Sequence, residues 1–140
     1  MSDYENYFEN MFKKLLGIPG VKAVMIVSHK GLPIASALPK GHNEIITAAI
    51  SASLFSTATR FVIEMQKGEF DQIIINGIEG YILIFPLGSN ALLTISTTKD
   101  ARLGLILSGN FGDYLKGFPF NRPPSPGAAG STEKKGLHEQ

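Results

Sequence analysis

Residues 45–59 read IITAAISASLFSTAT, an uncharged run in the middle of the chain. The pattern predicts one long helix from about Asn43 to Gln66, in which Arg60 and Glu64 are the first charges after the run. A helix that covers one side of a small domain shows a charged outer face. Most of this helix lacks such a face, so we expect it to be covered on two sides, by the domain's own sheet and by a second chain.

Shorter elements are predicted on both sides of the long helix. Five strands are predicted, at residues 21–28, 32–38, 70–76, 80–85 and 91–96. Two further helices are predicted, from Ser2 to Gly17 and from Leu103 to Leu115. The first and fourth strands are apolar on both faces, which is typical of strands that are covered on both sides. Hairpin connections then favour an antiparallel sheet between two helical layers, an α+β fold.

Several short motifs follow one another in the order of a known family. They are GVKAV at residues 20–24, GLPIA at 31–35, GYILIFPLG at 80–88, ALLTI at 91–95 and ARLG at 101–104. Together with the small-residue helix, they resemble the Roadblock (dynein light chain) family, and its prokaryotic members in particular. The resemblance implies a five-stranded sheet of order 2-1-5-4-3 (Roadblock/profilin-like), with the long helix on one face and the terminal helices on the other. Residues 1–116 are expected to form this domain, and residues 117–140 a flexible tail rich in Pro and Gly.

The same resemblance implies a function without chemistry of its own. Members pair as homodimers or heterodimers through the long helix and the third strand, and they act as platforms or regulators for Ras-like small GTPases. The chain is therefore expected to be a non-enzymatic scaffold or regulator that pairs with itself or a paralogue and binds a small GTPase. Modulation of the GTPase activity of that partner is one such role. No cofactor is expected.

The residues themselves also favour a dimer. In the implied strand order, the second and third strands form the edges of the sheet, and Pro33 and Pro39 block the second. The third strand has no proline or lysine, and only Asp71 acts as a gatekeeper beside its isoleucines. An open edge of this kind invites pairing with another strand. We predict a dimer interface made of Ala49, Ala52, Ser53, Ser56, Arg60, Ile73, Ile74 and Ile75.

Composition excludes several classes of site. The chain has no cysteine, which rules out disulfides, thiolate metal ligands and a cysteine nucleophile, and which fits a cytoplasmic protein. A net charge of +1 gives no electrostatic reason to expect nucleic acid as a partner. The uncharged run is shorter than the about 20 apolar residues of a membrane span and is rich in Ser and Thr, so no membrane insertion is expected.

Few polar side chains stand out as candidates for a site. The three histidines lie in a predicted turn, a loop and the tail, without the spacing of a metal site. The candidates for contact with a partner are His42, Arg60 and Lys67. Two alternatives remain open, namely a PAS-like sensor domain, which encloses a small molecule in a pocket, and a profilin-like cytoskeletal binder.

Overall fold

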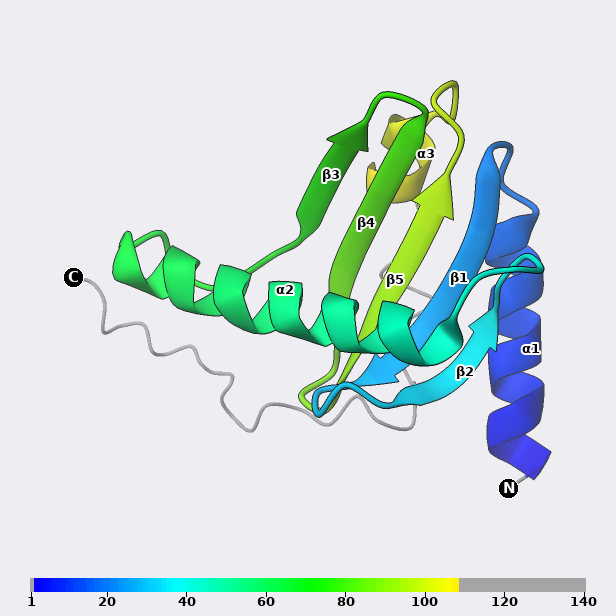
Figure 1. Ribbon diagram of the computed structural model, residues 1–140, viewed down its shortest axis with the longest axis horizontal. Helices are drawn as coiled ribbons and strands as arrows, with labels where there is room; N and C mark the ends of the chain where they lie inside the picture. Colours follow the sequence, from blue (N-terminus) through cyan, green and yellow to red (C-terminus); the bar gives the residue numbers. More distant parts are fainter. Residues whose placement is uncertain (1, 109–140) are drawn as a thin grey trace.

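A five-stranded antiparallel sheet carries helices on both faces (Figure 1). The computed structural model describes the backbone of residues 2–108 and the side chains of residues 7–107. The helices are α1 (Ser2–Leu16), α2 (Glu44–Glu64) and α3 (Leu103–Ser108). The strands are β1 (Val21–Ser28), β2 (Pro33–Ala37), β3 (Ile73–Gly77), β4 (Gly80–Leu87) and β5 (Ala91–Thr97). The strand order is β2-β1-β5-β4-β3, which confirms the order that the family resemblance implied.

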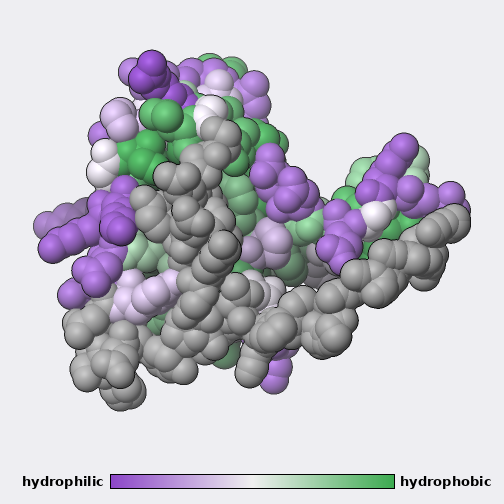
Figure 2. Space-filling view, turned by 180° about the vertical axis from the view of Figure 1, so that it is seen from behind, coloured by the Kyte–Doolittle hydropathy of each residue, from purple (hydrophilic) through white to green (hydrophobic). Residues whose placement is uncertain are grey.

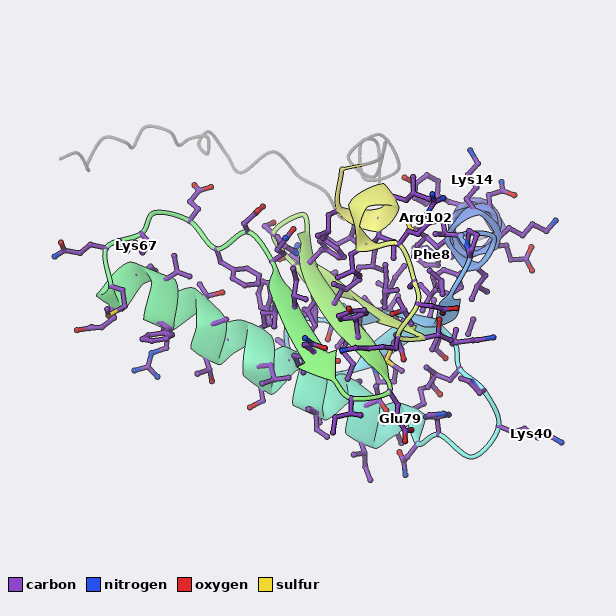
Figure 3. All side chains as sticks on the ribbon, turned by 90° about the horizontal axis from the view of Figure 1, so that it is seen from above. Phe8, Lys14, Lys40, Lys67, Glu79 and Arg102 are labelled. Carbon is purple, nitrogen blue, oxygen red and sulfur yellow. The ribbon has the colours of Figure 1, made fainter. Side chains whose placement is uncertain are left out.

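The two faces of the sheet are buried under different helices. Successive side chains of a strand point to opposite faces, so the doubly apolar β1 contributes to two cores. The core under α1 and α3 consists of Met11, Leu15, Val21, Val24, Ile26, Leu83, Phe85, Leu87, Ala91, Leu93, Ile95 and Ile106. The core under α2 consists of Met25, Val27, Ala48, Ile84 and Leu92. Figure 3 shows the sheet between these two layers.

The long helix α2 is capped at both ends, close to the predicted bounds. The side chain of Asn43 accepts a hydrogen bond from the N–H of Ile46 at 2.9 Å, as predicted for an N-cap. At the other end Gln66 has a φ of 58°, and its N–H donates to the carbonyl of Ile63 at 3.0 Å. A left-handed residue in this position closes the last turn of a helix.

The C-terminal part of α2 extends past the sheet. The helix packs against β1, β2 and β5, and Figure 1 shows its far end projecting beyond β3. We call residues 60–65 the overhang. The chain then returns from the overhang to the sheet through residues 66–72.

The edge strand β3 is shorter than predicted. The sequence predicted a strand at residues 70–76, but β3 begins only at Ile73. The ring of Phe70 packs edge-on against Phe55 of α2, with 5.1 Å between the ring centroids. This contact holds the chain out of line with the strand, so residues 70–72 belong to the connection from α2.

Two other strands also differ at their ends. β2 begins at Pro33 instead of Leu32, because the N–H of Leu32 donates to the hydroxyl of Ser28 within the preceding turn. β4 continues through Pro86, beyond its predicted end at residue 85. A proline lacks the N–H that a partner strand would need, and β3 pairs with β4 only as far as Ile84.

The last helix is described only in part. α3 begins at Leu103, as predicted. Its predicted continuation to Leu115 lies outside the described residues, and so does the predicted tail at residues 117–140. The division of the chain at residue 116 therefore stays a prediction.

Candidate functional site

An apolar groove runs along one flank of α2, where the helix leaves part of the sheet uncovered. Its volume is about 310 Å³. Ile50 and Leu54 of α2 form one wall, and Ile75 of β3 and Ile82 of β4 form the other. The remaining lining residues are Lys22, Ala23, Met25, Leu38, Pro39, His42, Thr47, Ser51, Ile84, Thr94 and Ser96. The groove therefore offers an occupant mainly aliphatic surface.

Two polar side chains that line this groove bond to each other. The hydroxyl of Thr94 on β5 donates to the hydroxyl of Ser51 on α2 at 3.0 Å, and both residues are buried. This bond fixes the helix to the sheet, since a buried hydroxyl without a partner is costly. Among the lining residues only Lys22 and His42 can carry a charge. The arrangement favours an apolar occupant over a strongly polar one.

The opposite flank of α2 carries the stripe of small residues that the sequence singled out. Ala49 and Ala52 face the turn between β1 and β2, and a side chain at Gly31 would lie 3.6 Å from the Cβ of Ala52. Gly31 has a φ of 92°, as the turn requires. At helical spacing from Ala49 follow Ser53, Ser56 and Arg60, all exposed. The predicted role of this stripe in an interface stays a prediction, and the groove lies on the other flank.

The overhang presents large apolar side chains to solvent. Phe61 and Ile63 are each 63% exposed, and Met65 is 53% exposed. Figure 2 shows this part of the chain projecting from the body, with apolar side chains between hydrophilic ones. Phe61 follows Leu54 by seven residues, so it continues the groove flank of the helix.

The helix as a whole is poorly covered. By length and composition α2 could also cross a membrane, a test that core helices of soluble proteins pass as well. Such core helices are mostly buried, whereas only 11% of the apolar window of α2 is buried. The described part of the chain therefore leaves most of this helix uncovered.

The predicted isoleucines of the open edge lie on β3. This strand pairs only with β4, which confirms that it forms an edge of the sheet. Ile73 packs against the core under α2, and Ile75 lines the groove. Ile74 lies between them in the strand, points to the other face of the sheet and is 42% exposed.

The candidates for partner contact do not come together in one place. His42 lines the groove, Arg60 lies on the opposite flank of α2, and Lys67 follows the overhang, pointing away from the body in Figure 3. Within the described residues, His, Asp and Glu form no group of three that could hold a metal ion. Burial raises the pKa of the Tyr7 hydroxyl, which packs on the far face of the sheet.

The residues of the groove flank were not predicted from the sequence. Ile50, Leu54 and Phe61 recur at helical spacing along α2. That spacing can be read from the sequence. It is hard to recognise there, because the small residues of the opposite flank lie in the same uncharged run.

Comparisons with known proteins agree on one family. The Roadblock/LC7 domain family matches residues 7–97. The uncharacterized protein MJ0310 of Methanocaldococcus jannaschii is 33% identical over 87 residues, which cover 62% of this chain and 75% of that protein.

Two solved structures show the same fold. A structure of MglB with a tetrameric arrangement has a TM-score of 0.72 at 18% identity and covers 82% of this chain and 86% of that chain. A Roadblock/LC7 domain from Streptomyces avermitilis has a TM-score of 0.65 at 16% identity. The match covers 73% of this chain and 85% of that chain. Since the family match extends over residues 7–97, the chain belongs to the Roadblock/LC7 family.

Proposed function

We propose that the protein is a cytoplasmic, non-catalytic scaffold or regulator that pairs with a second copy of itself and binds a Ras-like small GTPase. The observation that carries the proposal is the match between two features of one face. The groove beside α2 is open, and the apolar side chains of the overhang are exposed. The open edge of β3 lies between them.

A two-fold axis at β3 would satisfy all three features at once. Pairing two β3 strands antiparallel gives one continuous sheet, and the axis keeps both α2 helices on the same face of it. Each overhang then reaches over the other copy's sheet. Since α2 crosses one half of its own sheet and leaves the groove in the other half, the rotation by 180° brings the overhang of the second copy over the groove.

The apolar character of both surfaces supports this pairing. Burying a side chain such as Phe61 is worth roughly 1.5–3 kcal/mol, and the walls of the groove include Ile50 and Ile82, which are 53% and 39% exposed. An isologous contact uses each of these surfaces twice. The tetrameric arrangement of the MglB structure is consistent with a family in which copies associate.

In this pairing, unlike in the interface predicted from the sequence, the flank of α2 that faces away from the groove would remain free. It carries small side chains at Ala49, Ser53 and Ser56, and Arg60 at the end of the stripe. Two such flanks lie on one face of the paired sheet and form a smooth platform with a cation on each copy. We assign the GTPase to this platform, because the Roadblock family resemblance implies a GTPase partner.

One observation favours a second candidate, a PAS-like sensor. A volume of about 310 Å³ lies at the lower end of the range for small-molecule sites. The hydroxyls of Ser51 and Thr94 already bond to each other, so a ligand there would be held by aliphatic contacts. In that case the protein would be stabilised by an apolar small molecule and would remain a monomer.

The deciding experiment combines mass and capture. Light scattering of the full chain is expected to give twice 15.1 kDa. Purified small GTPases of the source organism, loaded in turn with GDP and a non-hydrolysable GTP analogue, are then tested for capture, and we expect one to bind in a nucleotide-dependent way. A monomer at every concentration contradicts the pairing, and no nucleotide-dependent binding across the set contradicts the GTPase role.

A further inference from the structure

The groove beside α2 has a floor that crosses four strands in one row. Ile75 of β3 lies opposite Ile82 of β4, which lies opposite Ser96 of β5, and Ser96 lies opposite Ala23 of β1. All four residues line the groove. Neighbouring strands are about 4.8 Å apart, so this row is roughly 14 Å long. Figure 1 shows that α2 crosses the other half of the sheet. The groove therefore has space for an extended chain that lies across the strands.

The two ends of this floor differ in their chemistry. The end at β3 is aliphatic, since Ile75 and Ile82 form it. The end at β1 carries Lys22, next to Ala23, where the register between β1 and β5 shifts. His42 lies at the same end, because the C-terminal end of β2 pairs with the N-terminal half of β1 and leads into the loop that contains His42. The groove is therefore apolar at one end and basic at the other.

The two basic side chains have no partner within the described part of the chain. Neither the ammonium group of Lys22 nor the imidazole of His42 makes a hydrogen bond or an ion pair with residues 7–107. The residues that line the groove include no Asp or Glu. Glu44, two residues after His42, does not line the groove and accepts a hydrogen bond from the hydroxyl of Ser36 at 2.9 Å. An anionic group at this end would thus complement the charge of the groove.

We infer that the groove is a binding site for an amphipathic anion, namely an unbranched aliphatic chain with a terminal carboxylate. The chain lies along the row from Ile75 to Ala23, and the carboxylate meets Lys22 and His42. A purely apolar ligand would leave the basic end without a counter-charge, and a small polar anion would leave the aliphatic walls exposed. With bonds of about 1.5 Å, an extended chain of about ten carbon atoms spans the row.

The ligand and the overhang of a second copy would need the same walls of the groove. Ile50 and Ile82 are 53% and 39% exposed in the single chain, and either occupant would bury them. A bound ligand therefore opposes the pairing, so the same groove makes assembly depend on the ligand. This consequence rests on the proposed function, whereas the binding of the ligand does not.

The first test compares head groups on one aliphatic chain. Octanoate, octan-1-ol and octylamine are titrated into the full chain in isothermal titration calorimetry. We expect octanoate to bind at least about tenfold more tightly than the other two, because a charge-assisted contact is open to the carboxylate alone. Each further buried methylene should add about fourfold, so decanoate should bind roughly fifteenfold more tightly than octanoate. Equal affinities for the three head groups, or no binding of decanoate, overturn the inference.

The second test locates the carboxylate. Lys22→Gln removes the charge but keeps a long polar side chain, and we expect it to weaken decanoate binding about tenfold and to leave octan-1-ol binding within twofold. His42→Gln should act in the same direction. The matched control is Lys30→Gln in the turn between β1 and β2, which does not line the groove and should change neither ligand. An equal loss of both ligands in Lys22→Gln would show a disturbed groove and overturn the assignment of the basic end.

The third test locates the aliphatic chain with two isoleucines of α2. Ile46 and Ile50 are 54% and 53% exposed, but of the two only Ile50 lines the groove. Ile50→Ser should weaken decanoate binding about tenfold, because it removes apolar surface that the ligand would bury. Ile46→Ser makes the same change in the same helix and should stay within twofold. Equal effects of the two substitutions overturn the assignment of the groove.

Light scattering with and without saturating decanoate separates this inference from the pairing. We expect the mass to fall from twice 15.1 kDa toward 15.1 kDa as decanoate binds. A chain that is monomeric without ligand and binds decanoate supports the site and overturns the pairing. A dimer that binds no decanoate overturns the site and leaves the proposed function standing. A dimer that keeps its mass with decanoate bound overturns the competition between ligand and overhang.

Discussion

The two faces of the sheet are built from the same strands but are closed in different ways. Under α1 and α3, twelve buried hydrophobic residues form one core, in which Leu15 and Ile106 of the helices are fully buried. Under α2 the hydrophobic core has only five buried residues, and the helix contributes a single one of them, Ala48. The first face is therefore covered by helices that contribute fully buried side chains. The second also has large aliphatic side chains, but it exposes them on the overhang and along the groove, as the proposed pairing requires.

The largest effect is expected in the core under α1 and α3. Leu15→Ala should lower the free energy of unfolding by about 2–5 kcal/mol, because it leaves a cavity where the side chain is fully buried. Phe61→Ala removes a larger side chain from the overhang and should affect only the part of the stability that depends on protein concentration. Urea denaturation at several protein concentrations measures both. Equal, concentration-independent losses would show that the overhang is packed within its own chain.

The next prediction separates the two flanks of α2. Phe61→Asp on the groove flank should weaken self-association about a hundredfold, equivalent to about 2.7 kcal/mol, because the carboxylate would enter an apolar groove. Ser53→Asp adds the same charge to the other flank, where Ser53 is exposed, and should leave the dimer intact. Sedimentation velocity at a series of dilutions distinguishes them. If Ser53→Asp dissociates the dimer and Phe61→Asp does not, the stripe predicted from the sequence is the interface and the groove is not.

The fold could be predicted because its signals are local and redundant. The doubly apolar β1 and β4, the turn glycine at Gly31 and the cap at Asn43 each point to the same elements as the structure, although β2 and β4 differ from the predicted bounds at their ends. The strand order is a different matter, since no property of single strands determines which ones become neighbours. It came from the resemblance of several motifs, taken in sequence, to one family.

The candidate site could be predicted only in outline. The sequence indicated that α2 needs a second cover, because the helix lacks charges. That β3 is an edge followed from the strand order that the resemblance implied, and the absence of proline and lysine marked this edge as open. It could not indicate which flank of α2 is free, since that depends on where the helix crosses the sheet. Nor could it indicate the start of β3, which is determined by the packing of Phe70 on Phe55. Both are consequences of tertiary contacts between distant residues.

A smaller effect is expected at the buried hydrogen bond between Thr94 of β5 and Ser51 of α2. Thr94→Val leaves the hydroxyl of Ser51 buried without its partner, which should cost about 1–2 kcal/mol of unfolding free energy. Combining it with Ser51→Ala removes both hydroxyls and should recover most of that loss. A double-mutant cycle by urea denaturation measures the coupling. Additive losses in the double variant would mean that the two hydroxyls contribute independently, and that the bond does not fix α2 to β5.

The smallest expected effect concerns the end of the overhang. Gln66 has a φ of 58°, a conformation that costs a residue with a side chain roughly 1–2 kcal/mol and costs glycine almost nothing. Allowing for the greater freedom of glycine in the unfolded chain, Gln66→Gly should raise the free energy of unfolding by about 0.5–1 kcal/mol. Gly68, with a φ of 93°, gives the control of opposite sign, since Gly68→Ala should destabilise by a similar amount. Thermal unfolding at constant protein concentration measures both. A lower melting temperature for Gln66→Gly would mean that a contact of the Gln66 side chain stabilises the fold by more than its backbone strain costs. The overhang would then be anchored from this end as well.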